Sequence, residues 1–249
     1  MLNQERYKLI QELIEERNTV TVAELAKELN TSESTIRRDL TALDQLGKIR
    51  KFFGGATAIK TNEGIFEDAV SVREAMMSEE KNAIGSYAAS LINDDDFVYI
   101  DSGTTTSRLI DFITNEKATY VTNGIAHAKK LIRKGLTAYV IGGKIKSVTE
   151  AVVGSEGINS LKNFNFSKAF MGANGIDIKG GFTTPDIEEA LVKQTAIERS
   201  YTAFVLADNS KFRRVFPVTF CELNKCCIIT DRLSDNSFSK ETIIKEVNK

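Results

Sequence analysis

The sequence predicts two domains of different fold class joined by a short linker. Residues 1–60 carry three helical patterns and a Gly-Gly hairpin, which indicate an α+β winged helix-turn-helix domain. Residues 78–249 alternate short apolar, strand-like runs with helical patterns, which predicts an α/β domain with a mainly parallel sheet. Between them, residues 61–77 lack a clear period and form the expected linker.

Two amphipathic helices open the chain. The first is expected from Asn3 to Arg17. The second begins at Thr21, where the sequence Thr-x-x-Glu to Glu24 is a capping box that supplies two otherwise unpaired backbone groups with partners. Their apolar stripes are Leu9, Ile10, Leu13 and Ile14 in the first helix, and Val22, Leu25, Ala26 and Leu29 in the second.

A third helix is expected from Ser32, its N-cap, to Leu46, before Gly47. Its apolar stripe is Ile36, Leu40 and Leu43, with Leu46 at the edge. The opposite face carries Ser34, Arg37, Arg38, Thr41 and Gln45. Such a face suits the major groove of DNA, where Arg binds guanine edges or phosphates. The alternative is an amphipathic surface helix with a solvated polar face.

A short hairpin follows the third helix. Residues 48–53 and 56–59 form its strands about Gly54-Gly55, and Phe52 and Phe53 are assigned to its core. Residues 32–60 hold six basic and three acidic side chains, whereas residues 1–31 hold four basic and six acidic ones. The positive charge therefore collects beside the third helix, and Lys48, Arg50 and Lys51 are expected to face phosphates.

The composition of the chain bears on membrane insertion, disulfide bonds and metal sites. The chain has 249 residues, a net charge of −1 and 42% hydrophobic residues, and no apolar run is long enough to span a bilayer. Without a signal-peptide pattern, we expect a cytoplasmic protein that does not bind membranes. The three cysteines lack CxxC spacing and are interpreted as reduced structural thiols. We expect no metal or cofactor, and His127 is interpreted as an ordinary helix residue.

The second domain is expected to begin with a helix that Ser78 caps. Strands are predicted at 97–100, 119–122, 138–141, 168–171, 203–206 and 227–230, and helices at 105–112, 125–133, 155–161, 187–200 and 240–244. In such domains ligands collect at the carboxyl ends of the parallel strands.

Polar and glycine-rich loops follow five of these strands. The loop Asp101-Ser-Gly-Thr-Thr-Thr106 leads into a helix and suits a phosphate dianion. Lys211 is the best cationic partner and Arg108 a weaker one, while Asp101, Asp186 or Glu188 could accept sugar hydroxyls. The other loops are 122–124, 142–143, 172–175 and 207–211. The alternative is that these glycines only shape tight turns.

The N-terminal motifs resemble those of DeoR-type bacterial transcription regulators. The run Ser32-Glu-Ser-Thr-Ile-Arg-Arg-Asp-Leu40 and the later Gly54-Gly55-Ala56 carry the resemblance, and Phe53 stands where that family usually has His. The resemblance implies that the third helix reads operator DNA while the hairpin contacts its backbone. The expected DNA-binding residues are Ser34, Thr35, Arg37, Arg38, Thr41, Lys48, Arg50 and Lys51.

The C-terminal half resembles ribose-5-phosphate isomerase, the fold that these regulators use as a sensor. The match covers 101–106, 172–177, 179–181, Glu188 and 210–211. The enzyme's Asp-Gly-Ala-Asp reads Met171-Gly-Ala-Asn174 here, so two acid–base groups are absent and we expect no enzymatic activity. The expected effector-binding residues are Asp101, Ser102, Gly103, Thr104, Thr105, Thr106, Thr122, Asn123, Gly142, Asn174, Glu188 and Lys211.

Within that family the chain is similar to repressors of fructose operons. The stretches 99–106, 122–124 and 181–186 with 189–191 carry this similarity. It implies a homodimeric or homotetrameric repressor that fructose 1-phosphate releases from double-stranded operator DNA. Effectors based on tagatose, glycerol or deoxyribose phosphate, an activator, and a sugar-phosphate isomerase stay open as alternatives.

Overall fold

The computed structural model describes residues 3–17, 19–46, 48–52, 54–58, 73, 76–233 and 235–247. The chain divides into two units, Met1–Glu63 and Gly64–Lys249, and each is described by itself. The expected linker, 61–77, lies outside the described residues except for Arg73, Met76 and Met77.

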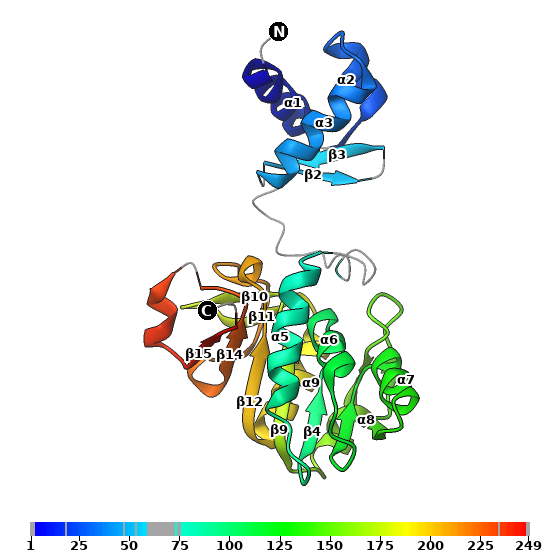
Figure 1. Cartoon of the computed structure of the whole chain (residues 1–249), viewed down its shortest axis with the longest axis vertical. Coiled ribbons are helices and arrows are strands. Elements are labelled where there is room, and N and C mark those ends of the chain that lie inside the picture. The colour runs from blue at the N-terminus through cyan, green and yellow to red at the C-terminus, as the bar shows by residue number, and fades with distance from the viewer. Residues whose placement is uncertain are drawn as a thin grey trace. The chain divides into compact units, whose positions relative to one another are not determined.

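The N-terminal unit packs three helices against a three-stranded antiparallel sheet of order β1-β3-β2 (Figure 1). The expected winged helix-turn-helix fold is confirmed, with one additional short strand, β1. The elements are α1 (Asn3–Arg17), β1 (Thr19–Thr21), α2 (Val22–Glu28), α3 (Glu33–Gln45), β2 (Ile49–Phe52) and β3 (Gly55–Ala58). The apolar stripes meet in one core that includes Ile10, Ile14, Leu25, Ile36, Leu40 and Ile49.

Local signals set the helix starts in this unit. Thr21 and Glu24 form the expected capping box of α2, and the Ser32 hydroxyl accepts a hydrogen bond from the Thr35 amide at the start of α3. The assignment of Phe52 to the hairpin core is wrong, because this side chain is 42% exposed. Ile49 points into the core, and alternation along the strand turns Phe52 to the other face. Phe53 lies outside the described residues.

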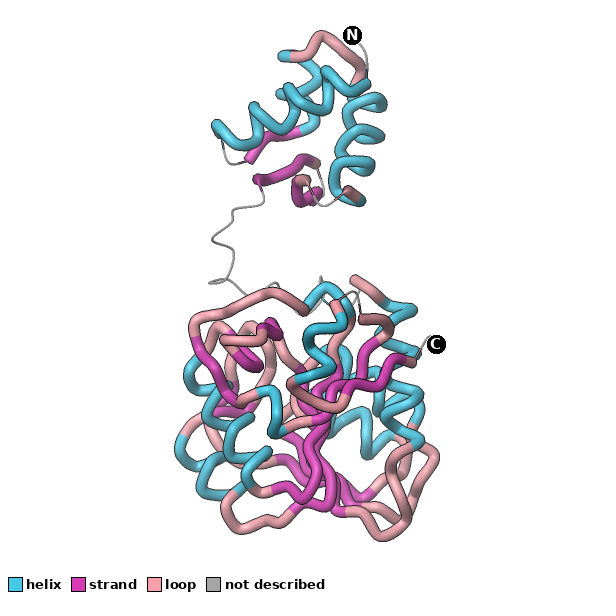
Figure 2. The backbone as a smooth tube through the Cα atoms, turned by 90° about the vertical axis from the view of Figure 1, so that its left-hand side faces the viewer, coloured by secondary structure: helices cyan, strands magenta, loops and turns pink. Residues whose placement is uncertain are grey.

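The C-terminal unit is built on a seven-stranded parallel sheet of order β15-β14-β12-β9-β4-β5-β6 (Figure 2). Its strands are β4 (Phe97–Ile100), β5 (Thr119–Thr122), β6 (Thr137–Val140), β9 (Phe166–Gly172), β12 (Ser200–Leu206), β14 (Cys227–Thr230) and β15 (Ile244–Glu246). The helices are α5 (Ser78–Ser90), α6 (Thr104–Phe112), α7 (Ile125–Arg133), α8 (Ser155–Leu161) and α9 (Ile187–Glu198). The expected mainly parallel α/β fold is confirmed.

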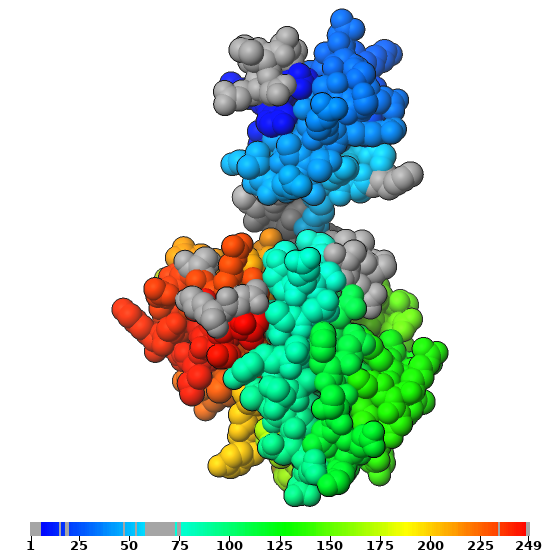
Figure 3. Space-filling view, viewed as in Figure 1, coloured from blue at the N-terminus to red at the C-terminus, as the bar shows by residue number. Residues whose placement is uncertain are grey.

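Helices cover both faces of this sheet. Val98 and Ile100 of β4 pack with α5 and α6, whereas Tyr99 packs into the core on the side of α8 and α9. Side chains of α5 and the neighbouring segments close the first of these faces (Figure 3). Because both faces are buried there, the central strand β4 is continuously apolar, whereas the edge strands β6 and β15 carry exposed or charged side chains.

Shorter strands form two further sheets. β7 (Lys144–Ile145) pairs with β8 (Val152–Val153), and the other sheet, of order β10-β11-β13, contains β10 (Gly175–Asp177), β11 (Gly181–Thr184) and β13 (Val218–Cys221). Three 3₁₀ turns cover Asn209–Lys211, Leu223–Lys225 and Asn236–Lys240.

Two local expectations in this unit are wrong. Residues 240–244 are not a helix: a 3₁₀ turn ends at Lys240, and Ile244–Glu246 joins the sheet edge beside β14. Five residues are too few for a stable helix, whereas the sheet edge offers backbone partners. Ser78 is not an N-cap, because Met77 holds that position in the left-handed region with a φ of 52°.

The strand order reverses beside β4. The chain passes from β4 to β5 and β6 on one side, then returns to place β9 on the other side of β4. The connections leaving β4 and β9 therefore diverge at their carboxyl ends and open a crevice between them. In open parallel sheets this is the usual place of a ligand site.

Candidate functional site

Helix α3 exposes the polar face that the sequence predicts. Ile36, Leu40 and Leu43 are buried, whereas Ser34, Arg37 and Arg38 are exposed. Arg37 donates to Glu33 over 2.9 Å, within the same helix. Arg38 forms no hydrogen bond or ion pair with any residue that the structure describes, so its guanidinium is the more available of the two.

A buried ion pair fixes α3 against α1. The Arg6 guanidinium donates two hydrogen bonds to the Asp39 carboxylate, one of them 3.0 Å long, and both residues are at most 9% exposed. The sequence pattern does not predict this pair, because the two residues lie 33 positions apart and Asp39 stands next to the polar face of α3. It sets the orientation in which Arg38 is presented.

Two hydrogen bonds connect the hairpin to the C-terminal part of α3. The Lys51 amide donates to the Asp44 carboxylate over 2.8 Å, and the Lys51 ammonium donates to the Thr41 hydroxyl over 2.6 Å. Two of the expected DNA-binding residues, Thr41 and Lys51, thus contact each other. Lys48 is exposed and Arg50 is half-buried on the same hairpin, so α3 and the hairpin together form a cationic surface.

The C-terminal unit holds a polar pocket at the crevice between β4 and β9. The space between its walls, including the open mouth, amounts to about 520 Å³. The loop after β4, the turn after β9 and the start of α9 form most of its wall. The lining residues are Arg73, Asp101, Ser102, Gly103, Thr104, Thr105, Thr149, Gly172, Ala173, Asn174, Glu189, Lys193, Leu206 and Lys211.

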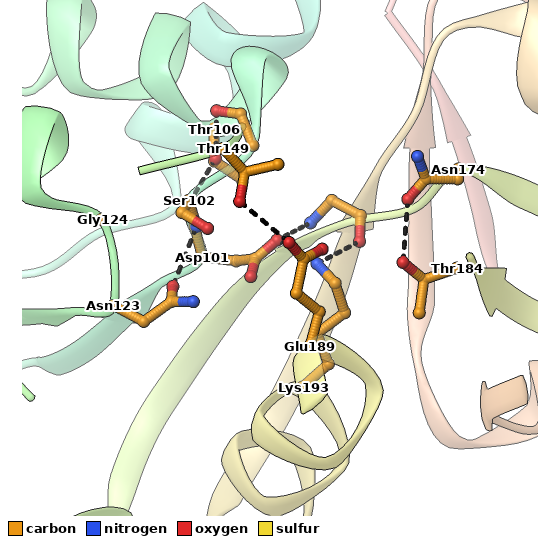
Figure 4. Close-up of polar contacts among 12 residues, drawn as sticks. Asp101, Ser102, Thr106, Asn123, Gly124, Thr149, Asn174, Thr184, Glu189 and Lys193 are labelled. Carbon is orange, nitrogen blue, oxygen red and sulfur yellow. Dashed lines mark hydrogen bonds and ion pairs between the residues drawn. The ribbon is translucent and has the colours of Figure 1, made fainter. Parts of the chain in front are cut away.

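An ion pair between Lys193 and Asp101 crosses the floor of the pocket (Figure 4). The Asp101 side chain is 1% exposed and also accepts a hydrogen bond from the Gly172 amide over 3.0 Å. The Lys193 ammonium donates to the Gly172 carbonyl over 3.1 Å and lies 5.6 Å from the centre of the Phe220 ring. The Oδ2 atom of Asp101 therefore links the end of β9 and Lys193 of α9 to the end of β4, and Asp101 also lines the pocket as expected.

Sequence reasoning missed Lys193 and Glu189. They lie four positions apart on α9, so both side chains leave the helix on the same face. Buried Ala190, Val192 and Ala196 occupy the same helix. Two charged groups on one face of an otherwise largely apolar helix were the signal that could have identified them.

Glu189, rather than the expected Glu188, lies in the pocket. Its carboxylate accepts hydrogen bonds from Lys146 over 2.8 Å and from the Thr149 hydroxyl over 2.9 Å. Glu188 does not line the pocket, and its carboxylate pairs with Lys144 over 3.1 Å. The physical reason is helical geometry, since successive residues on α9 point about 100° apart.

The expected residues Ser102, Gly103, Thr104, Thr105, Asn174 and Lys211 all line this pocket. Asn174 lies opposite the loop, and its amide oxygen accepts a hydrogen bond from the Thr184 hydroxyl over 3.1 Å (Figure 4). Hydroxyl, amide and ammonium groups therefore face one another across the space, a combination that suits a phosphorylated polar ligand.

Four other expected residues lie behind the pocket wall or away from it. The Thr106 hydroxyl donates to the Gly103 carbonyl over 2.7 Å, and the Thr122 hydroxyl accepts from the Gly124 amide over 3.0 Å. Asn123 accepts from the Ser102 amide over 3.0 Å, which holds the loop in place. Gly142 does not line the pocket either. These short polar side chains stabilise the turns that follow strands, which is the alternative reading of such loops.

His127 supports the same loop from the other side. It is buried, and its Nε2 atom lies 3.0 Å from the Gly103 carbonyl oxygen, so that Nε2 carries the proton and donates. Burial lowers the pKa of His127 to about 4, although the Gly103 carbonyl and Asp101 oppose this shift. His127 is thus a residue of helix α7, as expected, and serves as a neutral structural support at pH 7.

The pocket is better arranged for binding than for proton transfer. Met171 is fully buried, Asp101 is paired with Lys193, and Glu189 is paired with Lys146. Lys179 does not line the pocket, nor does Arg108, which lies 3.8 Å from Asp111. In the described part of the chain, no cluster of three or more His, Cys, Asp or Glu residues could hold a metal ion.

Two family models match the chain. One, described as a DeoR-like helix-turn-helix domain, covers residues 6–62, and the other, described as a DeoR C terminal sensor domain, covers residues 76–232. Together they span the cationic surface of the N-terminal unit and all of the pocket residues except Arg73.

Relatives with curated names are similar over most of their length. The uncharacterized HTH-type transcriptional regulator FruR of Bacillus subtilis is 38% identical and covers 99% of both chains. The HTH-type transcriptional regulator IolR of the same organism is 34% identical over 94% of both, and a lactose phosphotransferase system repressor of Staphylococcus epidermidis is 34% identical over 89% of both.

Two solved structures show a more distant likeness. Ribose 5-phosphate isomerase A from Methanocaldococcus jannaschii is 13% identical, covers 54% of each chain and has a TM-score of 0.41. The full-length sorbitol operon regulator SorC from Klebsiella pneumoniae is 13% identical, covers 85% of this chain and 90% of its own, and has a TM-score of 0.38.

Among the described residues, no helix has the length and apolar character needed to cross a membrane.

Proposed function

Because the chain belongs to the DeoR family of helix-turn-helix transcriptional regulators, we propose that it is a cytoplasmic repressor of a sugar-utilisation operon. A sugar phosphate binds the pocket of the C-terminal unit and releases the protein from its operator. The observation that carries this proposal is one chain that combines an exposed Arg38 on α3 with a pocket lined by hydroxyls, amide groups and cations.

Fructose 1-phosphate is the effector that we propose first. The curated names FruR and lactose phosphotransferase system repressor support a phosphorylated sugar. The loop Ser102–Thr105 and Lys211 favour a phosphate, while Asn174, Thr149 and Glu189 offer partners for sugar hydroxyls. Phosphates of tagatose, glycerol or deoxyribose are the alternatives within the same chemistry.

DNA recognition follows from the exposed face of α3. Arg38 and Arg37 are proposed to bind base edges in the major groove, with Ser34, Thr35 and Thr41 beside them and the hairpin residues Lys48, Arg50 and Lys51 on the backbone. A homodimer or homotetramer would present two or more such helices to repeated half-sites. The effector then shifts the population toward an arrangement of the heads that fits those half-sites less well.

A thermal-shift panel tests the effector class. Fructose 1-phosphate, tagatose, glycerol and deoxyribose phosphates, and unphosphorylated fructose are each added to the full chain. At one hundred times its dissociation constant, a bound effector stabilises the folded state by about 2.7 kcal/mol, which raises the melting temperature measurably. A chain that responds to none of the phosphates, or responds equally to fructose, would contradict the proposal.

Replacing Lys211 tests the cationic side of the pocket. We expect Lys211→Ala to raise the fructose 1-phosphate concentration for half-maximal operator release by about tenfold, because a charge-assisted hydrogen bond to phosphate contributes about 1.5–3 kcal/mol. Gel shifts with increasing effector measure the effect. Lys240→Ala removes the same charge from an exposed position outside the pocket and serves as the control. An induction curve that matches that control would remove Lys211 from the site.

A further inference from the structure

One residue of the pocket lies near the N-terminal end of the C-terminal unit, in the stretch that the sequence predicts as a linker. Arg73 lines the pocket together with Ser102, Asn174 and Lys211, although it precedes α5 and lies inside the expected linker 61–77. None of the motifs considered in the sequence pointed to it. A ligand that contacts this side of the pocket can therefore act directly on the chain that leads to the DNA-binding unit.

Lys81 holds the main chain at this point. It lies on the first turn of α5, is 3% exposed, and its ammonium donates a hydrogen bond to the Arg73 carbonyl. Burial lowers the pKa of Lys81 to about 8. Asp208 opposes this shift, whereas the positive charges of Lys211, Arg73 and Arg108 add to it. Lys211, Arg73 and Arg108 thus lie close enough to repel the Lys81 ammonium.

A buried carboxylate lies close to these cations. Asp208 is fully buried, and its Oδ2 atom has no hydrogen-bond partner in the part of the chain that the structure describes. A dianion at the mouth of the pocket would offset the repulsion among the cations. Phosphate suits this place because Arg can bind two of its oxygens in a bidentate arrangement while Lys contributes a point charge.

We propose that Arg73 binds the phosphate of the effector, and that Lys81 transmits this contact by holding the Arg73 main chain to α5. This inference rests on the proposed function and deepens it, since it assigns the route by which pocket occupancy reaches the DNA-binding unit. The effector fixes the end of the connecting segment, which limits the arrangements that the heads can adopt on DNA. Such coupling needs an effector that favours one of two arrangements.

The test separates effector affinity from coupling. Calorimetry of the full chain with fructose 1-phosphate gives the affinity, and gel shifts without and with saturating fructose 1-phosphate give the ratio of operator dissociation constants. The variants are Arg73→Gln, Arg73→Lys and Lys81→Gln, with Arg133→Gln as the control. Arg133 lies exposed on α7, outside the pocket, and its replacement removes the same charge. Circular dichroism confirms that each variant is folded.

We expect Arg73→Gln to weaken fructose 1-phosphate binding at least tenfold, and to reduce the ratio of operator dissociation constants at least fivefold even at saturation. Arg73→Lys should restore part of both, and Lys81→Gln should reduce the ratio. Suppose that wild type responds to fructose 1-phosphate, and that Arg73→Gln matches the control Arg133→Gln in both effector affinity and the ratio of operator dissociation constants. This inference is then wrong, while the proposed function stands. If wild type binds no sugar phosphate, both are wrong.

Discussion

Arg38→Ala is expected to lower operator affinity by about 1–3 kcal/mol for each half-site, or about fivefold to more than a hundredfold. Arg38 is exposed on α3 and forms no hydrogen bond or ion pair with any described residue, so the substitution removes a proposed DNA contact without disturbing the core. Gel shifts or fluorescence anisotropy on the promoter fragment of the operon measure the loss.

Two further variants make this test specific. Lys8→Ala removes a positive charge from α1, where the side chain is 79% exposed, and should change affinity little. Arg38→Lys keeps the charge but loses the bidentate fork, so it should bind DNA yet discriminate less between operator and altered sequences. The melting temperature and the response to fructose 1-phosphate should match wild type in each case. Equal operator affinity of Arg38→Ala and Lys8→Ala would refute the assignment of α3 as the reading helix.

Lys193→Met is expected to destabilise the C-terminal unit by about 3–5 kcal/mol. The substitution leaves the Asp101 carboxylate buried without its cation. Among the described residues, only the Gly172 amide then remains as a hydrogen-bond partner of Asp101 Oδ2. The loss of stability should be largest in a urea titration that follows the unfolding of the C-terminal unit. Part of the stability should return in the double variant Asp101→Asn with Lys193→Met, because no unpaired charge is then buried.

Lys179→Met is the matched control for this experiment. Lys179 is exposed, and its side chain has no recorded ion pair among the described residues, so its replacement should change stability by less than about 0.5 kcal/mol. A Lys193→Met protein as stable as this control would mean that the ion pair does not hold the ends of β4 and β9 together.

The sequence predicts the elements that depend on local periodicity and capping. The stripe of Ile36, Leu40 and Leu43 defined α3, and Thr21 with Glu24 defined the start of α2. The main strands were found because both of their faces are buried, which makes them short apolar runs. Because parallel strands end at a common edge, the sequence also predicts that the loop after β4 and the turn after β9 lie close together.

The remaining features depend on contacts between distant residues. Lys193 meets Asp101 across 92 positions and Arg6 meets Asp39 across 33, and no spacing rule predicts such pairs. Strands of two or three residues, such as β7 and β10, are too short to show a period. Arg73 was not predicted as a pocket residue because its segment carries no motif, although the fold brings it to the pocket mouth.

The most direct test of the account titrates a preformed complex of the full-length protein and its operator with fructose 1-phosphate, followed by gel shift. The account predicts that the complex dissociates as the phosphate is added and that unphosphorylated fructose at the same concentrations leaves it intact. A complex that persists at saturating concentrations of every sugar phosphate in the panel, or that fructose dissolves equally well, would contradict it.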